Sequence, residues 1–258
     1  MSLTVGGLWI GKELSNMEKM SINSFLKHGY VYHLYTYDKV EGVPSGAIVK
    51  DANEILNVSE VYAYNNGSMS SISNRFRFEL MYKTGIPWVD ADLICVKYYD
   101  FSDDEYLIMS ESNKKYDEEK ICAGILKFPK GDPILLEAIE MCDKKKQEIL
   151  NGTIAWGVGP STTKHIVETY NLQKYVKPWY FANSCSCHHT DSLINPNWKT
   201  KDANPKSEII YSKRITDLPE GTYFIHLWNE FWRRNNLDKN GEFPKNTLYE
   251  DLKLLYFN

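Results

Sequence analysis

Residues 88–96 read WVDADLICV, an apolar segment interrupted by two acidic residues. The flanking residues are typical of a buried β-strand. A carboxylate inside such a strand is costly to bury unless it is paired, hydrogen-bonded or bound to a metal. Side chains two residues apart on a strand lie on the same side, so we expect Asp90 and Asp92 to be neighbours. Two adjacent anions repel each other unless a cation lies with them.

The Asp90-Ala91-Asp92 tripeptide also has a plain structural explanation. Asp-x-Asp occurs by chance in many proteins, and the two acids would then cap the next turn and face water. In open α/β sheets, however, ligands bind at the carboxyl ends of strands, where carboxylates can hold Mg²⁺ or Mn²⁺ together with a diphosphate. The tripeptide alone leaves both interpretations open.

The segments before this strand alternate between strand and helix patterns. Residues 4–10 and 30–37 are β-prone, and residues 15–26 between them have helical spacing. Ser15 followed by Glu18 is a capping box for that helix. Such a β-α-β unit gives parallel strands joined by a right-handed crossover. The pattern predicts an α/β fold with a mixed, mainly parallel central sheet flanked by helices.

The rest of the chain supplies further elements of the same kinds. Further helices are expected over 73–83, 133–150, 162–170 and 247–257, and further strands over 48–49, 106–110, 121–128 and 223–228. Residues 180–205 are rich in Asn, Ser, Cys, His and Pro and are expected to be loop-rich. The last helix carries Leu248, Leu252 and Leu255 on one side and should pack onto the core. We expect residues 1–258 to form a single domain.

Composition excludes several classes of partner. The chain has 258 residues with a net charge of −4, which argues against nucleic acid. No signal peptide or membrane-spanning run is evident, so we expect a cytoplasmic protein with at most peripheral contact with the inner face of a membrane. Five scattered cysteines fit reduced thiols. Aromatic residues make up 14% of the chain, which leaves rings available for sugars or bases.

The segment from Ser73 to Asp92 resembles the sugar-binding region of the DXD glycosyltransferases, a family that includes α-1,4-galactosyltransferases and bacterial capsular or lipopolysaccharide sugar transferases. Members typically show Ser-Asp-x-x-Arg, a helix, Gly-Gly, and then an aromatic-x-Asp-x-Asp strand. Here Gly85-Ile86-Pro87 replaces the Gly-Gly turn. The resemblance continues in order through residues 8–11, 21–29, 43–46, 51–52, 128–133, 157–160 and 226–229, and it leaves out 180–205.

The resemblance implies a GT-A fold and transfer of a hexose, with retention of configuration, from a nucleotide sugar to a glycan or lipid-linked acceptor. UDP-sugars are favoured as donors, and Mn²⁺ or Mg²⁺ is the expected cofactor. By position, Asp92 would be a direct metal ligand, Asp90 would contact the metal or the ribose of the donor, and His226 would complete the metal site. Carboxylates and imidazole both suit Mn²⁺. Arg77 would contact the donor sugar or phosphate and, with the two acids, form the catalytic set. The loop-rich 180–205 segment would lie near the acceptor.

Four further positions are expected to contact the nucleotide sugar. Trp9 and Trp228 lie within matching segments, and Trp228 would lie against the diphosphate or sugar. Asn74 stands where the family has Asp, which leaves the donor sugar open. Gly159 belongs to a Gly-x-Gly-Pro turn that either cradles a phosphate at a helix N-terminus or is simply a turn.

Several residues have competing explanations. His226 taken alone would more often be a structural histidine, and Cys185-Ser186-Cys187-His188-His189 lacks the spacing of a zinc site. Cys122 is the polar residue expected near the anomeric carbon, which favours same-face attack without a covalent intermediate; Glu111 and Asp132 are further polar candidates. Two other functions stay open: hydrolysis of nucleotide sugars, and an inactive nucleotide-sugar- or carbohydrate-binding protein.

Overall fold

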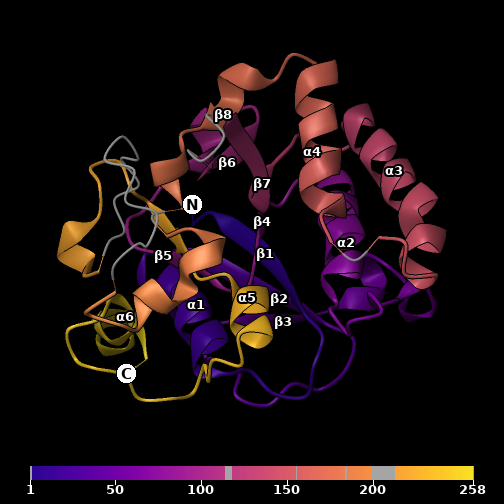
Figure 1. The fold of residues 1–258 in the computed structure, drawn as a ribbon. Helices are drawn as coiled ribbons and strands as arrows, with labels where there is room; N and C mark the ends of the chain where they lie inside the picture. Colours follow the sequence, from indigo (N-terminus) through magenta and orange to yellow (C-terminus); the bar gives the residue numbers. More distant parts are fainter. Residues whose placement is uncertain (1, 114–117, 155, 184, 199–212, 258) are drawn as a thin grey trace.

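A seven-stranded sheet runs through the centre of the described part of the chain, in the order β3-β2-β1-β4-β7-β6-β8 (Figure 1). The computed structural model describes residues 2–113, 118–154, 156–183, 185–198 and 213–257. The strands are β1 (Thr4–Trp9), β2 (Val31–Thr36), β3 (Ile48–Asp51), β4 (Trp88–Val89), β6 (Leu107–Asn113), β7 (Glu118–Lys127) and β8 (Val176–Lys177). Among them, β7 is antiparallel to both neighbours and the other pairs are parallel. The predicted mixed, mainly parallel sheet is confirmed.

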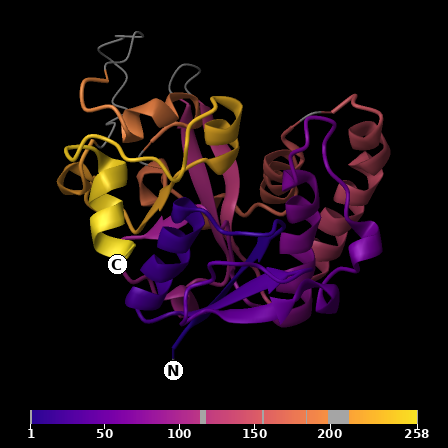
Figure 2. The same cartoon turned by 90° about the horizontal axis from the view of Figure 1, so that it is seen from below.

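Two groups of helices flank the sheet, as Figure 2 shows. The first group comprises α2 (Ser70–Thr84), α3 (Pro133–Leu150) and α4 (Val158–Thr169), which pack against one another. The second comprises α1 (Asn16–Lys27) and α6 (Leu248–Tyr256), and α5 (Asn229–Arg234) follows the last strand. Short 3₁₀ turns complete the described chain: η1 (Ala52–Glu54), η2 (Val58–Glu60), η3 (Phe101–Asp103), η5 (Gln173–Tyr175), η6 (Trp179–Phe181), η7 (Cys187–Leu193) and η8 (Ile215–Asp217).

Helix α1 shows why the predicted β-α-β unit forms. The carboxylate of Glu18 accepts hydrogen bonds from the backbone N–H of Ser15 at 2.7 Å and from its hydroxyl at 2.5 Å, which is the predicted capping box. Met17, Met20, Ile22 and Phe25 of this helix are fully buried, and Met17 and Met20 belong to the same apolar cluster as α6. The β1–β2 pair is parallel, as the crossover requires.

The last helix packs onto α1 as expected, although its buried face differs from the prediction. Leu248 and Leu252 are buried, whereas Leu255 is 38% exposed. Tyr249 and Tyr256 complete the buried face instead. No helix in the described residues is long and apolar enough to cross a bilayer.

The expected single strand over 88–96 was wrong. Strand β4 ends at Val89, and the next residues form a turn in which the N–H of Leu93 donates to the carbonyl of Asp90 at 3.1 Å. The chain then leaves the central sheet as β5 (Leu93–Cys95), which pairs antiparallel with β9 (Phe224–His226) in a separate sheet. Asp92 is 8% exposed in this turn, so its buried carboxylate needs hydrogen-bond and charge partners.

The segment 180–205 was predicted to be loop-rich, and its described part is more ordered than that. It contains η7 and the end of η6, and Cys185 and Leu193 are buried in the same cluster as α6. Residues 184 and 199–205 of the prediction lie outside the described residues. The five cysteines, all within the described chain, are free thiols as expected.

Candidate metal and nucleotide-sugar site

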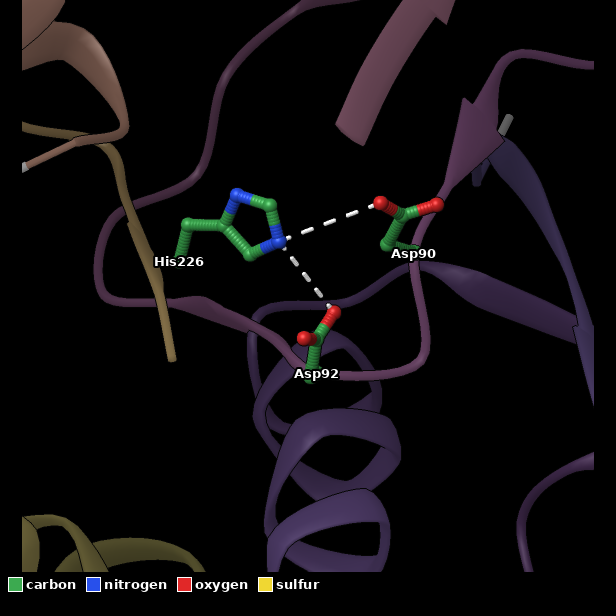
Figure 3. A group of neighbouring side chains, drawn as sticks. All are labelled: Asp90, Asp92 and His226. Carbon is green, nitrogen blue, oxygen red and sulfur yellow. Dashed lines mark ion pairs between the residues drawn. The ribbon is translucent and has the colours of Figure 1, made fainter. Parts of the chain in front are cut away.

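The two carboxylates of the turn after β4 point toward one side chain from the far end of the chain, His226 (Figure 3). Asp90 Oδ2 lies 3.8 Å and Asp92 Oδ1 lies 3.4 Å from His226 Nε2. The other oxygen of Asp90 accepts hydrogen bonds from Trp88 Nε1 at 2.8 Å and Arg77 Nη2 at 3.2 Å. The other oxygen of Asp92 accepts from the backbone N–H of Asn229 at 2.6 Å. Each carboxylate is therefore held by one oxygen and presents the other to the imidazole.

The β5–β9 pair explains how His226 reaches the acids. Leu93 is opposite His226 in the register, and the N–H of Leu227 donates to the carbonyl of Asp92 at 3.0 Å. The imidazole stacks on Trp228 with ring centroids 3.9 Å apart and an interplanar angle of 26°. The antiparallel register fixes the position of His226 along β9, and the stacked indole fixes the plane of its ring.

The cluster has the geometry and the room that a cation needs. Asp90, Asp92 and His226 each offer one ligand atom, and these atoms lie within 4.8 Å of one another. A Cβ at Gly124 would lie 3.2 Å from Asp90 Oδ2 and 3.1 Å from His226 Cε1, so glycine keeps the space beside the cluster open. Carboxylate oxygens and imidazole nitrogen are suitable ligands for Mn²⁺. The group can therefore hold a divalent metal ion.

Burial and mutual charge move the pKa values of these groups apart. Burial raises the pKa of Asp90, and the nearby Arg77 offsets only part of that rise. Burial also opposes ionisation of Asp92, but the adjacent His226 and the N–H of Asn229 lower the pKa of Asp92 below its usual range. For His226, burial opposes the charged form, yet the charge of Asp92 raises the pKa of the imidazole well above 6.5. Without a metal, the imidazole therefore keeps its proton to a higher pH than an ordinary histidine does.

A pocket of about 560 Å³ opens over this cluster. It is lined by seven of the eight side chains or glycines predicted from the sequence: Trp9, Asn74, Arg77, Asp90, Asp92, His226 and Trp228. The eighth, Gly159, does not line the pocket in the described chain; it lies in the first turn of α4 against the carboxamide of Asn74. A Cβ at Gly159 would collide with Asn74 Oδ1, so this glycine allows close helix packing beneath the pocket.

Arg77 is largely committed to its protein neighbours. It is 5% exposed and donates to the carbonyls of Ala123 at 2.5 Å and Ser73 at 3.2 Å, in addition to its ion pair with Asp90. Its guanidinium carbon lies 5.1 Å from the ring centroid of Trp88. The visible effect of Arg77 is to orient Asp90 and to supply the nearest positive charge to it.

The two tryptophans predicted to contact the ligand, Trp9 and Trp228, differ in their neighbours. Trp228 is 7% exposed and donates from Nε1 to the carbonyl of Cys185 at 2.8 Å, so its ring is a support for His226. Its backbone is left-handed, with φ of 62°, a conformation that costs about 1–3 kcal/mol for a non-glycine residue and clusters at functional sites. Trp9 lies at the end of β1, and Lys239 Nζ is 5.4 Å from its ring.

The structure adds pocket residues that the sequence did not indicate. Trp88, Asn229 and Gly124 hold or make room for the carboxylates, as described above. Trp156 lines the pocket with 42% of its surface exposed, and its ring is edge-on to Phe231 at 6.0 Å. An aromatic residue before Asp-x-Asp was the available signal for Trp88; the others depend on contacts distant in sequence.

The remaining polar candidates lie outside the pocket in the described chain. Asp132 caps α3 through the N–H of Ile134 and accepts a hydrogen bond from Tyr106. Glu111 accepts a hydrogen bond from the thiol of Cys187 at 3.2 Å. Among the described residues, the group that could hold a metal is Asp90, Asp92 and His226, and it includes no cysteine.

By sequence, the chain matches no protein-family model and no curated protein. Its fold is similar to that of the apo-form glycosyltransferase GlyE of Streptococcus pneumoniae TIGR4, with a TM-score of 0.51 and 12% identity over 93% of this chain. The chain covers 61% of the length of that protein. The PaToxG glycosyltransferase aligns with a TM-score of 0.48 and 15% identity, over 68% of this chain and 75% of its own. The likeness to GlyE shows that the chain has a GT-A-like fold.

Proposed function

We propose that the protein is a metal-dependent, retaining glycosyltransferase that moves a hexose from a nucleotide sugar, with UDP-sugars favoured, to a glycan or lipid-linked acceptor. The observation that carries this proposal is the convergence of Asp90, Asp92 and His226 at the floor of one pocket. The acids follow the end of β4, where ligands bind in open α/β sheets. The GT-A-like fold supports the same reaction class.

The main chemical task is to stabilise the nucleoside diphosphate that leaves when the anomeric C–O bond breaks. A divalent cation held by the cluster would supply Lewis-acid stabilisation of several kcal/mol, and each 1.36 kcal/mol is a factor of ten in rate. Asp90 and Asp92 place two negative charges where such a cation would lie, and His226 adds a nitrogen ligand. Arg77 and Trp88 keep the carboxylate of Asp90 in position for this task.

Retention is proposed to proceed by attack of the acceptor on the same face that the diphosphate leaves. A covalent route would need a carboxylate beside the anomeric carbon, and β7 instead presents Cys122, Ala123 and Gly124 to the pocket. Glu230 also lines the pocket, but its carboxylate is paired with Arg233 at 2.7 Å and Arg234 at 2.8 Å. This arrangement supports the direct route.

An exposed tryptophan that lines the pocket supports a carbohydrate acceptor. Trp156 contacts the guanidinium of Arg234, 4.6 Å from its ring centroid, and the ring of Phe231. A fixed indole offers a broad apolar surface at little entropic cost, which suits the apolar face of a sugar ring. We therefore infer that the acceptor presents a glycan to this side of the pocket.

The test incubates the purified protein with Mn²⁺ and a panel of UDP- and GDP-sugars, and measures nucleotide release with and without acceptor glycans. We expect release that requires the cation and rises when the correct glycan is added. Equal release without any acceptor would instead support a nucleotide-sugar hydrolase. Donor binding without release would support an inactive binding protein, the alternative that the Asn74 substitution motivates.

Mn²⁺ binding is expected to be strongly pH-dependent. Because the charge of Asp92 raises the pKa of His226, a cation competes with a proton for the imidazole nitrogen up to a higher pH than at an ordinary histidine. Apparent affinity should therefore rise with pH, by up to about tenfold per unit, until the pH reaches the pKa of His226, with about one proton released per ion. Calorimetry in buffers of different ionisation enthalpy measures this release. In His226→Gln the dependence should flatten; an equally steep dependence in that variant would contradict the assignment.

A further inference from the structure

We propose that Cys122 is a positioning residue for the metal site: its sulfur accepts a hydrogen bond from the Nδ1–H of His226 and so directs the Nε2 lone pair toward the carboxylates. This inference rests on the proposed function for its metal, but not for its geometry. Cys122 Sγ lies 3.9 Å from His226 Nδ1, and both side chains are 5% exposed. The two ring nitrogens therefore face different groups, Nδ1 a thiol and Nε2 two acids.

Coordination requires one tautomer of the imidazole. A neutral imidazole carries its proton on one nitrogen and its lone pair on the other, so a ring that binds a cation through Nε2 must be protonated at Nδ1. A buried N–H that lacks an acceptor costs about 1–3 kcal/mol. Metal-bound histidines accordingly donate the second N–H to a fixed partner, which sets the tautomer and the orientation of the ring. The sulfur of Cys122 is the atom placed to accept from His226.

The neighbouring elements hold this pair in place. The backbone of Cys122 lies in β7, where Cys122 is paired with Met109 of β6. On the other side, Trp228 stacks on the imidazole and prevents it from tilting. The stacked ring can still turn over, which would exchange Nδ1 for a ring carbon, and stacking does not distinguish these two orientations. The thiol distinguishes them, because only one brings an N–H to sulfur.

The test compares Cys122→Ala and Cys122→Ser with the wild-type chain, using Mn²⁺ alone as the probe in calorimetry. Cys142→Ala is the matched control, since Cys142 is also fully buried but lies on α3 and does not line the pocket. We expect Cys122→Ala to weaken Mn²⁺ binding by about tenfold or more, the usual effect of losing such a partner. Cys122→Ser should recover most of the affinity, because a hydroxyl also accepts from N–H. Cys142→Ala should bind as the wild type does.

A spectroscopic measurement separates positioning from simple loss of packing. In ¹⁵N NMR of the Mg²⁺-loaded protein, the wild-type His226 should carry its proton on Nδ1, and Cys122→Ala should show a mixture of tautomers. Unchanged Mn²⁺ affinity together with an unchanged tautomer in Cys122→Ala would overturn the proposal. If the wild type bound no divalent ion, the metal-dependent function would fall, and the tautomer of the neutral ring in the metal-free protein would still decide the role of Cys122.

Discussion

Replacement of Asp92 by asparagine should abolish Mn²⁺-dependent binding of the nucleotide sugar, with a loss of affinity greater than about 100-fold. Loss of a partner behind a metal ligand costs 10–100-fold, and loss of the ligand itself should cost more. Asparagine suits this test because its carbonyl can still accept from the N–H of Asn229, which Asp92 holds at 2.6 Å. The hydrogen bond at the N-terminus of α5 is then preserved while the negative charge of residue 92 is removed. Calorimetry with Mn²⁺ and UDP-sugars measures the loss.

The control for Asp92→Asn is Asp103→Asn, which removes the same charge from an exposed position at the end of η3. It should bind Mn²⁺ and donor as the wild type does. A second readout is the pKa of His226, which should fall in Asp92→Asn because the carboxylate that raises it is gone. Mn²⁺-dependent donor binding that survives in Asp92→Asn would remove this carboxylate from the metal site.

Replacement of Arg77 by methionine should lower both the stability and the metal affinity of the protein. Arg77 is the buried cation that balances Asp90, and removal of one partner of a buried ion pair costs about 3–5 kcal/mol. The side chain of Asp90 is 23% exposed, so we expect a value near the lower limit, about 3 kcal/mol. The pKa of Asp90, already raised by burial, should rise further and make protons stronger competitors of Mn²⁺. Urea unfolding and Mn²⁺ calorimetry measure the two effects.

Arg75→Met separates these effects, because Arg75 lies on the same helix and is 11% exposed, yet it pairs with Glu60 and Asp143 outside the pocket. This control should lose stability and retain Mn²⁺ affinity. Arg77→Met should lose both, with Mn²⁺ binding weakened by at least about tenfold at neutral pH. Equal Mn²⁺ affinity in the two variants would show that Arg77 acts on folding alone.

Local signals predicted much of the fold. The capping box and helical spacing of α1 and the β-prone segments on either side of it depend on residues a few positions apart, and the structure places α1, β1 and β2 there. The turn at Asp90 was missed because an apolar run on both sides of two acids gives no local sign that β4 and β5 belong to different sheets. That division depends on β9, which arrives more than a hundred residues later.

For the candidate site, too, local signals could be recognised in the sequence and contacts distant in sequence could not. The two acids were identifiable from their spacing, and His226 was identifiable only through an ordered resemblance, since a single histidine carries no such information. Gly159 shows the limit of that approach: the glycine stands in the matching position, and in this chain it serves the packing of α4 against Asn74. The roles of Gly124 and Asn229 arise from contacts distant in sequence, whereas Trp88 had a local signal, its place two residues before Asp90.

The hydrogen bond from Asn229 to Asp92 spans 137 positions of the chain, and the imidazole joins the acids across a similar span. During synthesis on the ribosome, the strands of the parallel half emerge long before β9, so the central sheet can begin to assemble while the cation site is still missing its nitrogen. A nascent or truncated chain that stops before β9 would carry the acids without their partner. Under the proposed function, such a chain would lack the nitrogen ligand of the cation, so the site would be complete only once β9 has paired with β5.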